Sequence, residues 1–122
     1  MKKTYETGLL GEEEAEACLT KEHGMTCLER RYRTRAGEID LILLDGDTVV
    51  FTEVKTRKTG EPGNGLSAVN TAKQKRIVNA ALLYLARKGW TDRPVRFDLV
   101  EIRDGEILYV PDAFRPYGHF YH

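Results

Sequence analysis

The stretch GEIDLILLDGDTVVFTEVKTRK, Gly37 to Lys58, contains two apolar runs joined by a short turn around Gly46. Aliphatic and β-branched runs on either side of a Gly-Asp or Asp-Gly pair are typical of a β-hairpin. Charged side chains are rarely fully buried unless they are paired or ligated, yet Asp40, Glu53 and Lys55 interrupt these runs. The sequence therefore predicts a hairpin that carries three ionisable groups in its most strand-like part.

The length of the turn decides whether the two acidic side chains meet, because side chains alternate between the faces of a strand. A two-residue loop at 46–47 places Asp40 directly opposite Glu53, with Cβ atoms about 4.5–5.5 Å apart. A two-residue loop at 45–46 makes them diagonal neighbours on one face. A three-residue loop puts them on opposite faces. Lys55 shares the face of Glu53 because the two lie two residues apart on one strand.

Two adjacent carboxylates and a lysine can act together on a phosphate group. The carboxylates repel each other, and a divalent cation removes that repulsion. Mg²⁺ favours one or two carboxylates together with waters and a substrate phosphate, and a nearby ammonium can hold a phosphate oxygen or orient an attacking water. Asp40, Glu53 and Lys55 thus predict metal-assisted hydrolysis of a phosphodiester. The alternative is an ion pair on a solvated sheet face, although the charges gather at the end of the hairpin away from the turn.

The remainder of the sequence alternates between helical and strand-like patterns. Helices are expected over residues 7–22, ended by Gly24, and from Ser67 or Thr71 to Lys88, followed by Gly89. Besides the hairpin, strands are expected over residues 26–33, 94–102 and 106–110. This order predicts an α/β protein in which a helix crosses over between strands of a mixed sheet.

Length and composition restrict the class of protein. The 122 residues predict one domain, 1–122, with 111–122 as an aromatic C-terminal arm that packs on the body or on a second subunit, which would make a homodimer. The chain has no apolar run near the roughly 20 residues of a membrane helix and no signal-peptide pattern. Cys18 and Cys27 lack a C-x-x-C spacing, so two free thiols in a cytoplasmic protein are expected.

Basic residues are clustered although the net charge is zero. A neutral chain is not expected to bind polyanions over its whole surface, but clusters that share a face form a local phosphate footprint. The alternative is a set of solvated faces. The candidates for contact with nucleic acid are Arg30, Arg33, Arg35, Arg57, Lys73 and Gln74.

Several motifs in a fixed order carry a family resemblance. They are G-x-x-G-E (Gly8–Glu12), Y-R-x-x-x-G-E-I-D-L-I (Tyr32–Ile42), F-T-E-V-K-x-R (Phe51–Arg57), a lysine-led second helix, and R-F-D (Arg96–Asp98). Over about residues 5–110 the chain resembles the YraN family, also called UPF0102. That family is similar in turn to archaeal Holliday-junction resolvases and to the wider PD-(D/E)xK nucleases with the restriction-endonuclease-like fold.

The resemblance implies a restriction-endonuclease-like mixed β-sheet flanked by helices, with an α-β-β-β-α-β core. It implies a Mg²⁺ or Mn²⁺ ion held by Asp40, Glu53 and, on the first helix, Glu12, with Lys55 as the catalytic lysine. The helical spacing itself places Glu12 at the border of an apolar stripe. Asp98 is expected to anchor its strand together with Arg96 rather than to act in catalysis.

One further match and two departures complete the comparison of motifs. Lys73 or Gln74 lies where these nucleases often carry a further polar residue on the helix after the lysine strand. Arg31 stands where the family more often has Asn, and Thr52 where it usually has Val. Thr52 is expected to point to the face opposite Glu53, so its side chain should not disturb the metal site.

The sequence therefore predicts a metal-dependent endonuclease that acts on branched or structured DNA. A rival prediction is a non-catalytic nucleic-acid-binding or assembly module on the same scaffold, which the neutral net charge favours. A third is a structural protein that dimerises through its aromatic C-terminal arm.

Overall fold

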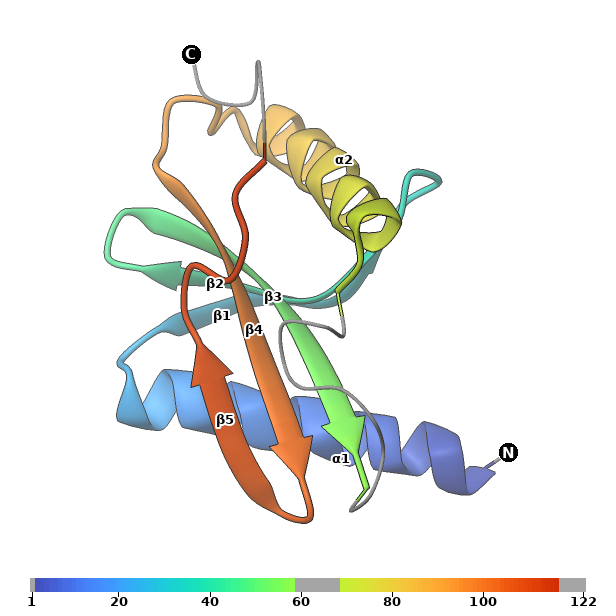
Figure 1. Ribbon diagram of the computed structural model, residues 1–122. Coiled ribbons are helices and arrows are strands. Elements are labelled where there is room, and N and C mark those ends of the chain that lie inside the picture. Colours follow the sequence, from blue (N-terminus) through green and yellow to red (C-terminus); the bar gives the residue numbers. More distant parts are fainter. Residues whose placement is uncertain (1, 59–68, 117–122) are drawn as a thin grey trace.

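A computed structural model describes residues 2–58 and 69–116, with side chains from residue 9 onward within those ranges. The elements are α1 (Lys2–Ala17), a short π-helical turn (Cys18–Glu22), β1 (Thr26–Arg33), β2 (Glu38–Asp45), β3 (Thr48–Arg57), α2 (Thr71–Lys88), β4 (Val95–Arg103) and β5 (Glu106–Val110) (Figure 1). The predicted order of elements is confirmed.

The five strands form one sheet in the order β1-β2-β3-β4-β5. The β3–β4 pair is parallel and the other three pairs are antiparallel. Parallel neighbours need a crossover connection, and here the chain between them includes α2. Figure 1 shows α1 crossing the sheet on the side away from α2. This mixed sheet flanked by helices confirms the predicted restriction-endonuclease-like α/β core.

The core has two halves, one on each face of the sheet. Phe51 and Ile42 pack toward α2 in a cluster with Tyr84, whereas Val50 packs on the α1 side in a cluster with Leu19. Successive residues of a strand point to opposite faces, so a sheet covered on both sides needs apolar residues at nearly every position of its central strands. Glu53 of β3 is consequently buried, whereas Asp40 and Lys55 are half-buried.

The helix boundaries differ in part from the prediction. α1 begins at Lys2 and not at residue 7, since the sequence before Gly8 contains neither glycine nor proline to stop a helix. Asn70 caps α2, because its side chain accepts the N–H of Lys73. The helix therefore begins at Thr71, and Ser67, the other expected start, lies outside the described residues.

The first part of the C-terminal arm packs on the body. The Ala113 N–H donates to the Phe97 carbonyl at 2.7 Å, and the rings of Phe114 and Phe97 are stacked with centroids 5.1 Å apart. Residues 117–122 of the arm lie outside the described ranges. Dimerisation through the arm stays a prediction.

The structure also describes the two cysteines and the character of the helices. Cys18 and Cys27 are both free thiols. None of the helices in the described ranges combines the length and the apolar character that a membrane crossing requires.

Candidate active site

The hairpin turn has the two-residue form that brings the acids together. Residues 46–47 form the turn, and Asp45 pairs with Thr48. The backbone pairing continues to Leu41 opposite Thr52. The same alignment extended by one residue sets Asp40 against Glu53, as the first of the turn alternatives predicted.

Asp40 attaches to the neighbouring strand through its side chain. Its Oδ2 accepts the backbone N–H of Val54 at 2.8 Å. In a regular antiparallel ladder a backbone carbonyl would accept that N–H. The carboxylate of β2 is therefore held directly against the backbone of β3, beside Glu53.

The pKa of Asp40 is raised well above its ordinary value. Burial is the largest cause and the negative charge of Glu53 the next, and the charge of Glu12 acts in the same direction. The hydrogen bond from Val54 opposes them, because it stabilises the ionised form. The structure thus brings the three predicted metal-binding acids, which come from α1, β2 and β3, into one electrostatic environment.

Glu53 is buried, and Lys73 reaches it from α2. The side chain of Glu53 is 7% exposed, and its carboxylate forms an ion pair with the Lys73 ammonium. Lys73 therefore joins the site, as the resemblance implied for Lys73 or Gln74. Gln74 instead donates its side-chain N–H to the Val69 carbonyl at 2.9 Å, so it stabilises the entry to the helix.

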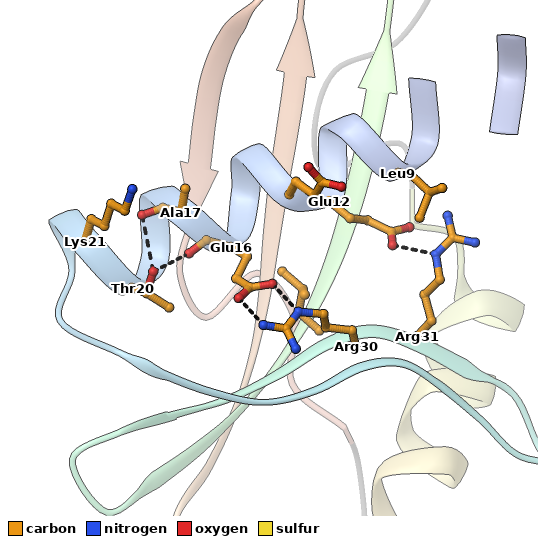
Figure 2. A pocket seen from close by; sticks show the side chains of 10 residues that line it. Leu9, Glu12, Glu16, Ala17, Thr20, Lys21, Arg30 and Arg31 are labelled. Carbon is orange, nitrogen blue, oxygen red and sulfur yellow. Dashed lines mark hydrogen bonds and ion pairs between the residues drawn. The ribbon is translucent and has the colours of Figure 1, made fainter. Parts of the chain in front are cut away.

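Glu12 is brought to the sheet by a glycine. A Cβ at Gly11 would lie 2.4 Å from the Oγ1 of Thr56, so only glycine permits this approach of α1 to β3. The Glu12 carboxylate accepts a hydrogen bond from the Nε of Arg31 at 2.7 Å (Figure 2). Arg31 has φ +49°, a left-handed conformation that Asn adopts more readily than Arg. This pairing was not predicted, although the substitution of Arg for Asn pointed to the position.

Lys55 is half-buried on the strand that carries Glu53. In the parallel β3–β4 pair it stands opposite Glu101, which is buried. Glu101 also forms an ion pair with Arg57 at 3.0 Å. Sequence reasoning missed Glu101, although its position two residues after the buried Leu99 signalled the same sheet face.

Two of the predicted phosphate-binding arginines have acidic partners. Arg30 makes a two-point ion pair with Glu16 of α1, with both N–O distances 2.6 Å (Figure 2). Arg33 pairs with Glu38 at 3.3 Å on the surface. Arg35 is exposed in the turn between β1 and β2. Arg30 is thus bound to α1, on the other face of the sheet from α2 (Figure 1), and its contact with nucleic acid stays a prediction.

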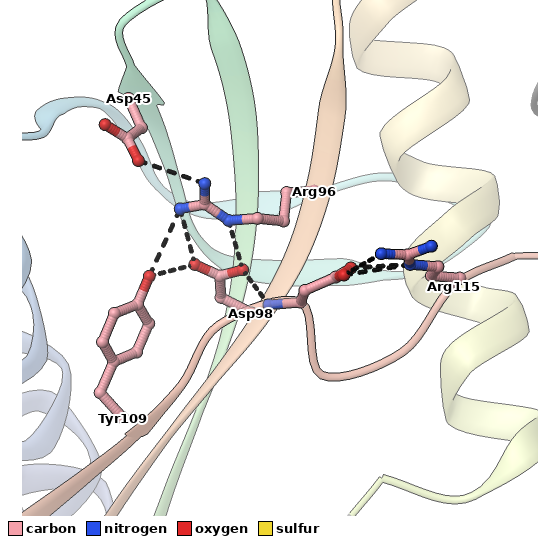
Figure 3. Close-up of polar contacts among 6 residues, drawn as sticks. Asp45, Arg96, Asp98, Tyr109 and Arg115 are labelled. Atoms are coloured by element: carbon pink, nitrogen blue, oxygen red, sulfur yellow. Dashed lines mark hydrogen bonds and ion pairs between the residues drawn. The ribbon is translucent and has the colours of Figure 1, made fainter.

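Asp98 has the structural role that was predicted for it. Its side chain is fully buried and accepts hydrogen bonds from Arg96 and Tyr109, and from the N–H of Asp112 (Figure 3). Arg96 also donates to Asp45 at 3.2 Å. Burial and the hydrogen bond to Asp98 raise the pKa of Tyr109. This network ties β4 to β5 and to the end of β2, away from the acidic cluster.

The donor set of the acidic cluster fits a divalent ion of the magnesium type. Asp40 and Glu53 supply the one or two carboxylates that such an ion uses, and their mutual repulsion is what a cation would relieve. Within residues 9–58 and 69–116, no three His, Cys, Asp or Glu side chains are already arranged around one point as ligands. Glu12 would have to turn from Arg31 to become a third ligand.

Asp40→Asn is expected to stabilise the metal-free protein at alkaline pH, by about 1 kcal/mol. The raised pKa means that the folded state holds a proton on Asp40 over a pH range in which the unfolded state has lost it. Stability therefore falls as pH rises through that range, and the neutral amide removes the loss. Urea unfolding in a chelating buffer measures the gain, which should shrink in acid. Asp47→Asn, at the exposed turn, is the control, and an Asp40→Asn variant no more stable than the parent at alkaline pH would contradict the assignment.

Comparisons with known proteins show the family of this chain. The family model described as "Uncharacterised protein family UPF0102" matches residues 11–102. The chain belongs to the UPF0102 family. A UPF0102 protein of Syntrophus aciditrophicus (strain SB) is 45% identical over 118 residues, 93% of this chain and 92% of the relative. One from Hahella chejuensis (strain KCTC 2396) is 36% identical over 115 residues, 92% of each chain.

The segment that matches the UPF0102 family model contains the whole acidic cluster. It begins at Gly11, the glycine that admits α1 to the sheet, and it ends at Ile102 in β4. β5 and the C-terminal arm follow the matched segment. The family membership therefore covers the part of the fold that positions the candidate site.

Proposed function

We propose that this UPF0102 protein is a Mg²⁺- or Mn²⁺-dependent endonuclease that hydrolyses phosphodiester bonds in branched or structured DNA. The observation that carries the proposal is the pairing of Asp40 with Glu53, whose charge raises the Asp40 pKa, with Lys55 two residues further along the same strand. Two carboxylates that repel each other cost stability in a resting protein, and perturbed pKa values of this kind cluster at functional sites.

Each residue of the site has a role in this hydrolysis. Asp40 and Glu53 would hold the metal ion, with Glu12 and the Val54 carbonyl as further ligands. The ion, when bound, supplies positive charge that polarises the phosphate and lowers the pKa of a bound water. Lys55 would position the attacking water and stabilise the charge that develops on the phosphate oxygens. The water oxygen bonds to phosphorus as the bond to the leaving sugar oxygen breaks; the attacking water gives up a proton to solvent, and the leaving oxygen takes up a proton from solvent.

The distribution of charge supports an approach of DNA from the side of α2. This helix carries Lys73, Lys75, Arg76, Arg87 and Lys88 and no acidic residue, whereas α1 has four glutamates between residues 12 and 16. A Cβ at Gly37 would lie 2.6 Å from the Arg76 carbonyl, so the turn that bears Arg35 touches α2. Asp40 lies three residues after Gly37, in β2. A polyanion on α2 would therefore meet the acidic cluster at the end of the helix that carries Lys73.

The proposal is tested by assays of cleavage and of metal binding on the same preparation. Four-way junctions, flaps and linear duplexes are incubated with Mg²⁺, with Mn²⁺ or with chelator, and nicking is expected only with metal. Titration calorimetry should show metal binding, and DNA affinity should fall steeply with salt. Absence of nicking on every substrate, with metal bound and DNA bound, would contradict an endonuclease.

A second candidate function is a nucleic-acid-binding or assembly module without turnover. The observation that favours it is that Glu12 and Glu53 already have basic partners, Arg31 and Lys73. Such a module would bind DNA without any metal dependence, so calorimetry separates it from the nuclease. A DNA-binding role of either kind is compatible with a cytoplasmic location, and so are the two free thiols.

A further inference from the structure

The Lys73 ammonium is paired with Glu53, one of the two carboxylates that the proposed metal ion needs. Asn70 accepts the Lys73 N–H at 2.9 Å, and Gln74 is bonded to the carbonyl of the buried Val69. These contacts fix the first turn of α2 near β3. The Lys73 side chain is 36% exposed and that of its partner Glu53 is 7% exposed. The ammonium thus stands between a buried carboxylate and solvent.

The pair made by Glu12 repeats this arrangement on the other side of the cluster. The Nε of Arg31 lies 2.7 Å from the Glu12 carboxylate, and the backbone of Arg31 is in a left-handed conformation. Glu12 and Glu53, the two acids whose charges raise the pKa of Asp40, therefore each have a basic partner. Asp40 has the backbone N–H of Val54. Without a metal ion, the side chains of Arg31 and Lys73 thus supply part of the positive charge that a divalent ion would bring.

We propose that Lys73 is an exchangeable counter-ion. A divalent cation that binds Asp40 and Glu53 displaces the Lys73 ammonium from Glu53, and the released ammonium binds a phosphate of the nucleic acid. The inference rests on the proposed function, because it concerns the metal and the phosphodiester of that reaction. A divalent charge repels a neighbouring ammonium, and the flexible four-carbon stem of lysine lets its point charge move to a new partner.

This exchange couples the two binding events. If metal frees Lys73 for a phosphate, then metal strengthens DNA binding, and by linkage DNA strengthens metal binding by the same factor. The exposure of Lys73 is consistent with this, because an ammonium at the rim of the site reaches an incoming phosphate without a rearrangement of α2. A purely structural ion pair would instead couple nothing, and its loss would weaken the fold.

The test uses Lys73→Met, which keeps the aliphatic stem and removes the charge. Titration calorimetry without DNA should show Mg²⁺ bound at least about fivefold more tightly by the variant, since no ammonium has to leave. The affinity for a fluorescent DNA duplex, measured by anisotropy, should rise with Ca²⁺ in the parent protein. Ca²⁺ is used because it shares the preference for carboxylate oxygen. Most of this rise should disappear in Lys73→Met and return in Lys73→Arg.

Lys75→Met is the matched control, because it removes an exposed cation from the same helix turn. It should leave Mg²⁺ affinity unchanged and lower DNA affinity equally with and without Ca²⁺. Equal or weaker Mg²⁺ binding by folded Lys73→Met would overturn the exchange while leaving the metal site in place. Absence of metal binding that depends on Asp40 in the parent protein would overturn the proposed function and the exchange together. Thermal unfolding of each variant verifies that the comparison is between folded proteins.

Discussion

The double variant Asp40→Asn with Glu53→Gln is expected to lose metal binding, and with it at least about 10³-fold in the rate of phosphodiester cleavage. The amides have nearly the same size as the carboxylates. The amide oxygen introduced by Asp40→Asn can still accept the Val54 N–H, which Asp40 accepts at 2.8 Å. The geometry of the hairpin should therefore survive while the negative charges disappear. A divalent ion then has no anionic ligand from β2 or from β3.

Calorimetry with Mg²⁺ and a nicking assay measure the two losses on one preparation. Glu38→Gln is the matched control, because Glu38 is an exposed acid on the same strand whose ion pair with Arg33 lies on the surface. Lys55→Met separates the roles further, since it should slow cleavage and leave Mg²⁺ affinity close to that of the parent. Cleavage that persists in the double variant would show that the reaction occurs elsewhere in the protein.

Asp98→Asn is expected to lower the free energy of unfolding by about 3–5 kcal/mol, the usual cost of breaking a buried ion pair from one side. The Asp98 carboxylate is fully buried and accepts from Arg96, from the Tyr109 hydroxyl and from the Asp112 N–H. An amide has a single oxygen, and its NH₂ group would face donors. The Arg96 guanidinium, which pairs with Asp98 at 2.9 Å, would lose its closest counter-ion.

Urea unfolding monitored by circular dichroism measures this loss of stability. Asp112→Asn is the control, because Asp112 is an exposed acid in the same region whose pKa is lowered by its hydrogen bond to Arg115. An exposed pair of this kind contributes about 0–1 kcal/mol, so the control should change little. A similar small effect in Asp98→Asn would mean that Asp98 does not anchor β4. Metal affinity should be the same in both variants, since the network lies away from the acidic cluster.

Local sequence patterns were enough for the order of the elements, and they limited the register of the hairpin to three alternatives. β1 and β5 have the predicted bounds, and the Gly46–Asp47 turn sets Asp45 against Thr48. The physical reason is that strand alternation and turn chemistry act between residues close in the chain. Once the turn is known, the convergence of Asp40 and Glu53 follows by counting. Asp98 and Arg96 were also paired correctly, because they lie two residues apart on one strand.

The partners of Arg30 and Lys73 were decided by the tertiary structure alone. Arg30 was expected at a phosphate and is bound to Glu16, because the path of α1 over the sheet brings together residues that are 14 positions apart. The contact of Lys73 with Glu53 depends on how the Asn70 cap sets the start of α2 against β3. Neither contact can be predicted from a local sequence pattern.

The sequence by itself determined that two carboxylates and a lysine lie toward one end of a hairpin, and that a two-residue turn puts them on one face, because side chains alternate along each strand. The family resemblance implied that Glu12 joins them, and only the tertiary structure decided that Arg31 and Lys73 neutralise part of their charge. The reason is physical: charges attract over distances that the fold sets, and Gly11 and Asn70 place both helices close enough for them to act.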